Sequence, residues 1–218
     1  MKVLNITTSS KGGAGIAALR LHQALIQNGA ASGFLSSNLT IDFDNKIVED
    51  LFFKYNKPSL LKKIRIKLEN YFFSSKRHQT IHYFESIKGK MQFEMASLPF
   101  SSFRLQDHPL VQEADIINLH WVGGLLDYPS FFKDCQKPMV WTFHDMNPFQ
   151  GLFHYKNDEL QNAKISADFD DKMKQIKASA MQQIKKGAMI TPSKWLLGEA
   201  TNSNFFSSFI KECIPYSI

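Results

Sequence analysis

Short apolar runs alternate with segments of helical periodicity along most of this chain. MKVLNITT, residues 1–8, is followed by a turn, SSKGGAG, and then by IAALRLHQALIQNG, in which Ile16, Leu19, Ala24 and Leu25 recur at helical spacing. Gly29 is well placed to end that helix, and ASGFLSS, residues 31–37, is a second strand-like run. Strands that alternate with helices predict a parallel sheet with right-handed crossovers. The expected fold is a three-layer, Rossmann-like α/β domain with helices on both faces of the sheet.

The second half of the chain returns to the same alternation. Its expected strands are DIINLHW, KPMVWTFHD, AMITPS and part of FIKECIPYSI, and its expected helices are HPLVQEA, LDYPSFFKDC, FDDKMKQIKASAMQQIKKG and KWLLGEATNS. The longest of these helices should turn Met173, Ile176, Ala180 and Ile184 inward. Because 218 residues with 44% hydrophobic content can bury one large core, we expect a single domain over residues 1–218.

Composition excludes several classes of protein. No stretch approaches the roughly 18 apolar residues of a membrane span, and the N-terminus lacks a signal-peptide pattern, which predicts a cytoplasmic protein. Cys135 and Cys213 have no CxxC companion, so neither a disulfide framework nor a zinc cluster is expected. The net charge of +6 permits an acidic partner but does not select one.

A basic segment interrupts the regular pattern, and we expect a helical insertion at about residues 54–90. Lys62, Lys63, Arg65 and Lys67 alternate there with apolar residues, as in helices that lie on anionic membranes. The alternative is a solvated helix that packs its leucines on the sheet. Single-stranded nucleic acid is a further candidate, but it is not expected because no RNA-binding signature accompanies the bases. MQFEMASLPF, residues 91–100, is strand-like, but the middle of the chain, about residues 42–106, is expected to hold the inserted helical segment plus irregular connections.

Polar residues follow four of the expected strands. They are the SSKGGAG turn, His120-Trp121, His144-Asp145 and Thr191-Pro192-Ser193. Parallel strands bring their carboxyl ends to one edge, where ligands bind near a topological switch point. These four chain segments should therefore meet in one cleft, where a neutral imidazole can donate or accept a hydrogen bond. The competing interpretation is that His144 only satisfies a loop carbonyl group.

The glycine-rich turn suggests phosphate or sugar binding. Gly12, Gly13 and Gly15 allow backbone to approach a ligand, the following helix offers free N–H groups, and Lys11 adds a positive charge. A tight turn without a ligand is the alternative. Residues 13–18 fit a GxGxxA dinucleotide pattern, but FLSSNL lacks the acidic residue expected after the second strand. A dinucleotide-dependent oxidoreductase is therefore the weaker candidate.

Other chemistries find less support in the sequence. A zinc or iron site built from His120, His144 and Asp145 is conceivable, but the histidine spacing does not require a metal. There is no P-loop pattern for a nucleotidase, and no GxSxG elbow for a covalent hydrolase.

Taken together, SKGGAG, INLHWVGG, KPMVWTFHDMNPFQGLFHY, ITPSKWL and CIPYSI resemble the amino-terminal domain of glycosyltransferase family 4. These are retaining enzymes with the two-domain GT-B fold, and the likeness is to the bacterial branch that assembles surface or capsular polysaccharide. The resemblance implies that this domain binds the acceptor, lipid-linked or polysaccharide, while a second Rossmann-like domain holds the nucleotide-sugar donor. That donor-binding domain is expected to be absent here, since the sequence stops where the interdomain link usually begins, and the chain alone is expected to be inactive.

The resemblance also assigns roles. It places Lys11, Gly12, Gly13 and Gly15 at the donor phosphates, His144 at the transferred sugar, and His120, Trp121 and Ser193 on the acceptor side. Asp145 is a candidate catalytic base by adjacency alone. No tightly bound cofactor or metal is implied; the nucleotide-sugar is a co-substrate. A lipid-linked acceptor would place the protein at the inner membrane face.

Two departures from the family pattern stand out. Phe153 occupies the cysteine position of a GGCHY-like element, and Tyr216 and Ser217 replace the asparagine and glycine of an IPNG-like turn. A sugar-binding or regulatory module without catalysis remains the first alternative, and the dinucleotide-dependent oxidoreductase remains the second.

Overall fold

The computed structural model describes residues 1–39, 52–54, 60–61, 64 and 75–216. In this part of the chain seven strands form one all-parallel sheet in the order β3-β2-β1-β4-β5-β6-β7. The strands are β1 (Lys2–Ser9), β2 (Ala31–Asn38), β3 (Phe52–Lys54), β4 (Ile116–Leu119), β5 (Met139–Thr142), β6 (Gly187–Thr191) and β7 (Ile210–Cys213). The predicted parallel α/β sheet is thus confirmed, and its order reverses between β1 and β4.

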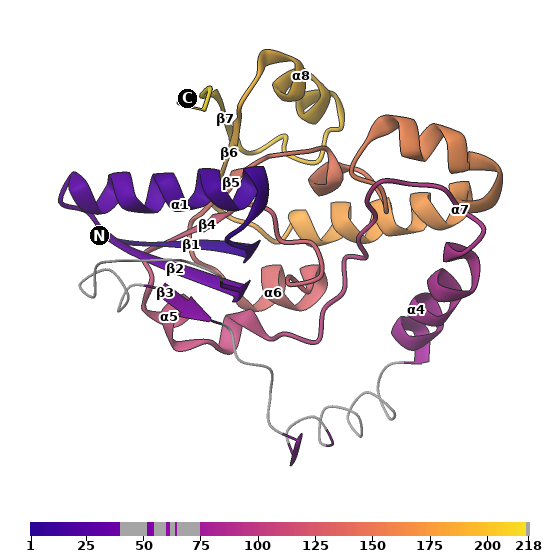
Figure 1. Cartoon of the computed structure of the whole chain (residues 1–218), viewed down its shortest axis with the longest axis horizontal. Helices are drawn as coiled ribbons and strands as arrows, with labels where there is room; N and C mark the ends of the chain where they lie inside the picture. Colours follow the sequence, from indigo (N-terminus) through magenta and orange to yellow (C-terminus); the bar gives the residue numbers. More distant parts are fainter. Residues whose placement is uncertain (40–51, 55–59, 62–63, 65–74, 217–218) are drawn as a thin grey trace.

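Helices cover both faces of this sheet. They are α1 (Gly12–Gln27), α4 (Ser75–Lys88), α5 (Pro109–Glu113), α6 (Tyr128–Asp134), α7 (Lys156–Met181) and α8 (Lys194–Asn202), with short 3-10 turns η1 (Leu105–Asp107) and η2 (Asn147–Phe149). Figure 1 shows α1 on one side of β1, β2 and β3, with α5 and α6 on the opposite side. This is the expected three-layer, Rossmann-like arrangement. No helix in the described ranges is long and apolar enough to cross a membrane.

Aromatic side chains fill the main core around β5. Trp141 and Phe143, at and just after the end of β5, pack on Phe132 of α6 and on Phe206 beyond α8, with ring centroids 5.7 and 5.0 Å apart. All four side chains are fully buried. Burying apolar surface of this size is the main source of folding free energy. The ends of β4 and β5 therefore rest on a rigid support.

A second core lies away from the sheet, where α4 packs on α7 (Figure 1). Phe84 and Ile87 of α4 contact Phe169 and Met173 of α7, and Tyr83 lies 5.0 Å from Phe169 between ring centroids. Within the insertion predicted at about residues 54–90, the structure has a helix over Ser75–Lys88. The predicted membrane-facing residues Lys62, Lys63, Arg65 and Lys67 lie outside the described residues.

One strand was not predicted: β3 is a three-residue edge strand that pairs with β2. The strand-like residues 91–100 form only an isolated bridge between Ala96 and Phe153, as the expected irregular connection implies. Buried Met91 and half-buried Phe93, Leu98 and Phe100 belong to the second core, so the apolar character that suggested a strand reflects loop packing.

The buried face of α1 also differs from the predicted one. Ile16 and Ala24 are exposed, whereas Gly15, Ala18 and His22 are buried against the sheet. The helix ends as expected: Gly29 has a φ of 76°, and Gly29 N and Ala30 N donate to the carbonyls of Ile26 and Leu25. This Schellman pattern suits glycine because the left-handed conformation strains other residues.

Candidate functional site

The switch point between β1 and β4 opens into a cavity of about 370 Å³. It is lined by Thr7, Ser9, Lys11, Gly12, Gly13, Ala14, Gly15, Met95, Trp121, His144, Asp145 and Tyr155. The glycine-rich turn after β1 and the chain segments after β4 and β5 thus share one cavity, as predicted. Ligands of open α/β sheets bind in this place.

One wall of this cavity is the amino-terminal end of α1. The N-cap residue, Lys11, makes no side-chain cap and the first turn holds no acidic residue. Asp127 and Ser193, in contrast, accept hydrogen bonds from the first-turn amides of α6 and α8. The first-turn N–H groups of a helix carry a partial positive charge, and a cation beside them adds to it. This end of α1 can therefore receive an anionic group such as a phosphate.

The three glycines of the turn have different structural roles. Gly12 and Gly13 are exposed, and Gly12 has a φ of 76°. Gly15 is buried, and a Cβ there would lie 2.4 Å from the carbonyl oxygen of Ser9. Gly15 is thus required for close packing of α1 on the end of β1, while Gly12 and Gly13 leave backbone open to the cavity.

His120 and His144 meet side by side beyond the ends of β4 and β5. Nδ1 of His120 lies 3.1 Å from Nε2 of His144, and the hydroxyl of Tyr216 lies 2.6 Å from Nδ1 of His144. The Tyr216 ring stacks on that imidazole at 5.4 Å between centroids. Burial lowers the pKa of His120 to about 3, and the neighbouring His144 lowers it further. Burial also lowers the pKa of His144 to about 4, although the charge of Asp145 acts to raise it. Both rings are neutral near pH 7.

Asp145 is engaged on both carboxylate oxygens. Oδ2 accepts from Nε1 of Trp121 at 2.9 Å and lies 2.6 Å from Nδ1 of His154, while Oδ1 accepts from the backbone N–H of Asn147 at 2.9 Å. The side chain is only 8% exposed. A carboxylate that makes hydrogen bonds to three groups orients those groups relative to one another. The geometry thus favours a positioning role for Asp145 over the predicted role as a base.

His154 completes a network that sequence reasoning missed. Its Nε2 lies 2.8 Å from Oγ of Ser97, so Ser97, His154 and Asp145 stand in the order of a serine-hydrolase triad. The half-buried Ser97 does not line the 370 Å³ cavity, nor a smaller pocket that is lined by His120, His144 and His154. Its Oγ packs closely on Gly123, where it would lie 2.6 Å from an added Cβ. We therefore interpret this network as a structural link. It joins the loop before η1 to the segments that follow β4 and β5.

A buried lysine supports the same region from α7. Nζ of the fully buried Lys177 donates to the carbonyl oxygen of Asn147 at 2.7 Å and lies 5.5 Å from the centre of the Tyr128 ring. Burial lowers the pKa of Lys177 to about 7, although Asp145 and Asp170 act in the opposite direction. Lys177 lies four residues after Met173 and three before Ala180, so a charged residue on the predicted inward stripe was the sequence signal that could have marked it.

Ser193 lies apart from this site. It does not line the cavity, and its Oγ accepts from the backbone N–H of Leu196 as the N-cap of α8. The fourth predicted strand end thus does not join the other three in the cavity wall.

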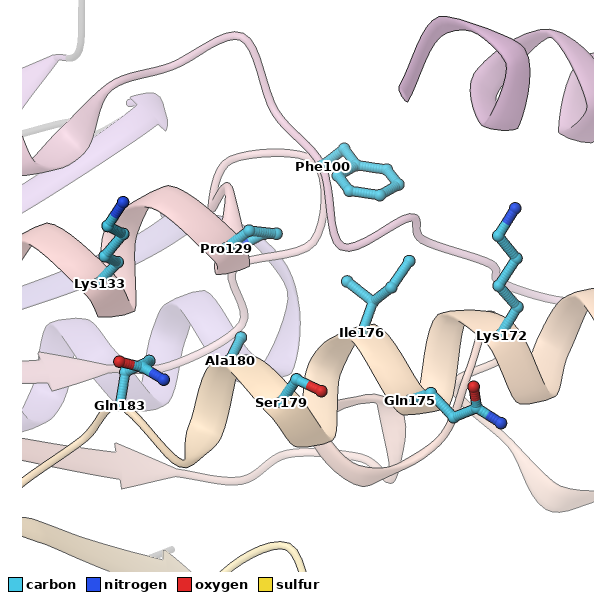
Figure 2. A pocket seen from close by; sticks show the side chains of 9 residues that line it. All are labelled: Phe100, Pro129, Lys133, Lys172, Gln175, Ile176, Ser179, Ala180 and Gln183. Atoms are coloured by element: carbon cyan, nitrogen blue, oxygen red, sulfur yellow. The ribbon is translucent and has the colours of Figure 1, made fainter. Parts of the chain in front are cut away.

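A larger groove of about 730 Å³ runs between α6 and α7 (Figure 2). Phe100, Pro129 and Ile176 line its middle, and Lys133 and Lys172 stand toward its two ends. It shares no lining residue with the 370 Å³ cavity and is lined by no histidine or carboxylate. We therefore place the candidate site at the sheet edge.

No protein-family model and no curated protein matches this sequence. Among the described residues, no group of three or more histidine, cysteine, aspartate or glutamate side chains is arranged to hold a metal ion. Nδ1 of His120 and Nε2 of His144 share a hydrogen bond, and the carboxylate of Asp145 is hydrogen-bonded to Trp121 and His154. The site has the chemistry of hydrogen bonding to a polar, anion-bearing ligand.

Proposed function

We propose that this chain is the acceptor-side domain of a retaining glycosyltransferase with a GT-B fold, similar to family 4. The reaction would move a sugar from a nucleotide-sugar donor to a polysaccharide or lipid-linked acceptor. One observation carries the proposal: the Lys11–Gly15 turn, Trp121 and His144 line a single cavity at the switch point of a parallel sheet. That combination offers helix N–H groups that could bind a phosphate, an indole ring and an imidazole within one cavity.

Each part matches a need of sugar transfer. The transition state has oxocarbenium character while a nucleoside diphosphate leaves, so fixed dipoles and cations near the phosphates matter more than a strong nucleophile. Lys11 and the uncapped first turn of α1 supply positive potential. The Trp121 ring can contact a sugar face, with its N–H held by Asp145.

The nucleotide-sugar is a co-substrate in this proposal, and a second Rossmann-like domain would hold most of it. His144 would contact the transferred sugar, and His120 would act through His144 because it is only 3% exposed. This differs from the sequence-based expectation that His120 contacts the acceptor itself.

One observation disfavours the dinucleotide alternative: β2 ends in Ser36, Ser37 and Asn38, without the acidic residue that binds a ribose 2′-hydroxyl. A sugar-binding module without catalysis would use the same cavity. A test of sugar transfer distinguishes the glycosyltransferase from the sugar-binding module, whereas a test of ligand binding does not.

Ligand binding to the 218-residue chain provides the first test. We expect uridine diphosphate to shift the backbone amide NMR signals of Gly12 and Gly13, and methyl glucoside to shift the indole signal of Trp121, each with a Kd of order 1 mM. Lys11→Ala should weaken the nucleotide effect, whereas Lys133→Ala, a lysine in the separate α6–α7 groove, should not. Shifts caused by NADH but by neither probe would favour the dinucleotide enzyme.

In the proposed reaction a donor-binding domain supplies the nucleotide-sugar, so turnover is measured with that domain present. In that complete protein we expect His144→Ala to reduce kcat strongly while the far-UV circular dichroism spectrum stays the same. Unchanged turnover would contradict the role of His144, and binding without any transfer to a glycosyl acceptor would favour the sugar-binding module.

A further inference from the structure

A buried chain of hydrogen bonds crosses the sheet toward the candidate site. Asn5 of β1 and Asn118 of β4 are directly paired in register, and both side chains are almost fully buried. Nδ2 of Asn118 lies 3.0 Å from Oδ1 of Asn5 and 3.1 Å from Nε2 of His120. The chain continues from His120 to His144, so two amides in the sheet centre contact the two imidazoles at its edge.

A backbone carbonyl group fixes the direction of this chain at its inner end. Nδ2 of Asn5 lies 3.4 Å from the carbonyl oxygen of Gly33, which can only accept a hydrogen bond. Oδ1 of Asn5 must then face Asn118 and accept from its amide N–H. The second N–H of that amide points at Nε2 of His120, which must be unprotonated.

A second carbonyl group is compatible with the same direction at the outer end. The Tyr216 hydroxyl lies 3.1 Å from the carbonyl oxygen of Phe143 and 2.6 Å from Nδ1 of His144. When its single proton is donated to the carbonyl, its oxygen accepts from an N–H on Nδ1 of His144. Nε2 of His144 is then the acceptor for Nδ1–H of His120. The two ends agree, although they lie on opposite sides of the imidazole pair.

We infer that Asn5 and Asn118 hold His120 and His144 as Nδ1–H tautomers, so that His144 offers its ligand a hydrogen-bond donor and not a base. Asn5, Asn118 and His120 are positioning residues in this arrangement. Thr142 supports it, because its hydroxyl donates to Oδ1 of Asn118 at 3.3 Å and keeps that oxygen turned away from His120. The low pKa of both histidines agrees with neutral rings.

The hydroxyl of Tyr216, which is not among the residues that line the cavity, occupies Nδ1 of His144. His144 lines the 370 Å³ cavity, and its N–H at Nδ1 is directed at that hydroxyl oxygen. A ligand hydroxyl that displaced Tyr216 could accept the same hydrogen bond. Assigning this hydroxyl to a sugar rests on the proposed function; the tautomer assignment does not.

Imidazole nitrogens can be read directly by NMR on the full chain. In a neutral ring, protonated and unprotonated nitrogens have widely separated ¹⁵N shifts, and their couplings to the ring carbon-bound protons distinguish Nδ1 from Nε2. We expect His120 and His144 both to carry the proton on Nδ1 at pH 7. A proton on Nε2 of either ring in the wild-type chain would overturn the inference.

Two substitutions identify what sets the tautomers. Tyr216→Phe removes the outer hydroxyl, and we expect both rings to keep Nδ1–H because the amides still direct the chain. Asn118→Asp removes the N–H that faces His120, and we expect both rings to move the proton to Nε2. A change of tautomer in Tyr216→Phe, or unchanged tautomers in folded Asn118→Asp, would contradict the role of the amides. Should Asn118→Asp fail to fold, the wild-type and Tyr216→Phe spectra decide.

A titration with methyl glucoside separates this inference from the proposed function. If both hold, the Nδ1–H signal of His144 shifts on binding and the hydrogen bond to Tyr216 is lost. If the sugar shifts Trp121 but not His144, the ligand part of the inference is wrong while the proposed function stands. If no sugar binds but the tautomers are as stated, the proposed function is weakened and the tautomer assignment remains.

Discussion

The indole N–H of Trp121 donates to Oδ2 of Asp145 over 2.9 Å, and this hydrogen bond joins the segment after β4 to the segment after β5. The same carboxylate contacts His154, which follows η2 and precedes α7. Asp145 therefore holds three parts of the chain in one geometry. Its removal should affect stability as well as ligand binding.

Asp145→Ala should lower the free energy of unfolding by about 3 kcal/mol, because buried donors on Trp121 and His154 lose their acceptor. Urea unfolding followed by circular dichroism measures this. Asp107→Ala is the control: it removes an exposed ion pair with Arg104 and should change stability by no more than about 0.5 kcal/mol. Equal effects of the two substitutions would contradict the structural role of Asp145.

Two glycines of the same turn should respond in opposite directions. Gly15→Ala places a Cβ 2.4 Å from the carbonyl oxygen of Ser9 and should destabilise the protein by about 1–3 kcal/mol or more. Gly13 lies in α1, and a Cβ added there would meet no atom of the neighbouring elements within 4 Å. Gly13→Ala should therefore leave the free energy of unfolding unchanged or raise it by up to about 1 kcal/mol. Urea midpoints of the two variants test this contrast. A stable Gly15→Ala protein would show that α1 does not pack this closely on β1.

Lys177 should make stability increase with pH above neutrality. Its pKa is about 7 in the folded protein and 10.5 in its ordinary state, so between these values the unfolded chain binds more protons. We expect the wild-type protein to gain stability from pH 7 to pH 9 and Lys177→Met to lose most of that gain. Thermal unfolding at the two pH values measures the difference. Lys172→Met, at an exposed position of the same helix, should behave like the wild type.

The buried histidines should make the stability of the protein depend on pH below about 6.5. Burial lowers the pKa of His22 to about 4, and His120 and His144 are lowered to about 3 and about 4, all from 6.5. The unfolded chain therefore binds more protons between pH 6.5 and about 4, and stability should fall as the pH falls, by about 1.4 kcal/mol per pH unit for each such histidine. His22→Gln should make this slope shallower. A stability that is constant from pH 6.5 to pH 5 would contradict the neutral buried state of these rings.

The sheet and the meeting of three strand ends could be predicted because alternation of strands and helices determines where parallel strands finish. The neighbours of His144 could not be predicted in the same way. His154 reaches Asp145 through the fold of an irregular loop, and Tyr216 reaches His144 from 72 positions further along the chain. Periodicity carries no information on such contacts. The buried face of α1 was also missed, since its centre is a glycine, an alanine and a histidine instead of large apolar residues.

The hydroxyl of Tyr216 lies 2.6 Å from Nδ1 of His144, so under the proposed function a ligand that binds to this atom must first displace a side chain of the same molecule. A tethered group competes at a high effective concentration, so added compounds would bind there only in the fraction of molecules in which the tyrosine ring has moved away. Affinities measured on this chain would then understate the intrinsic affinity of the cavity. A screen for ligands of the cavity should begin with a variant that has a small side chain at position 216.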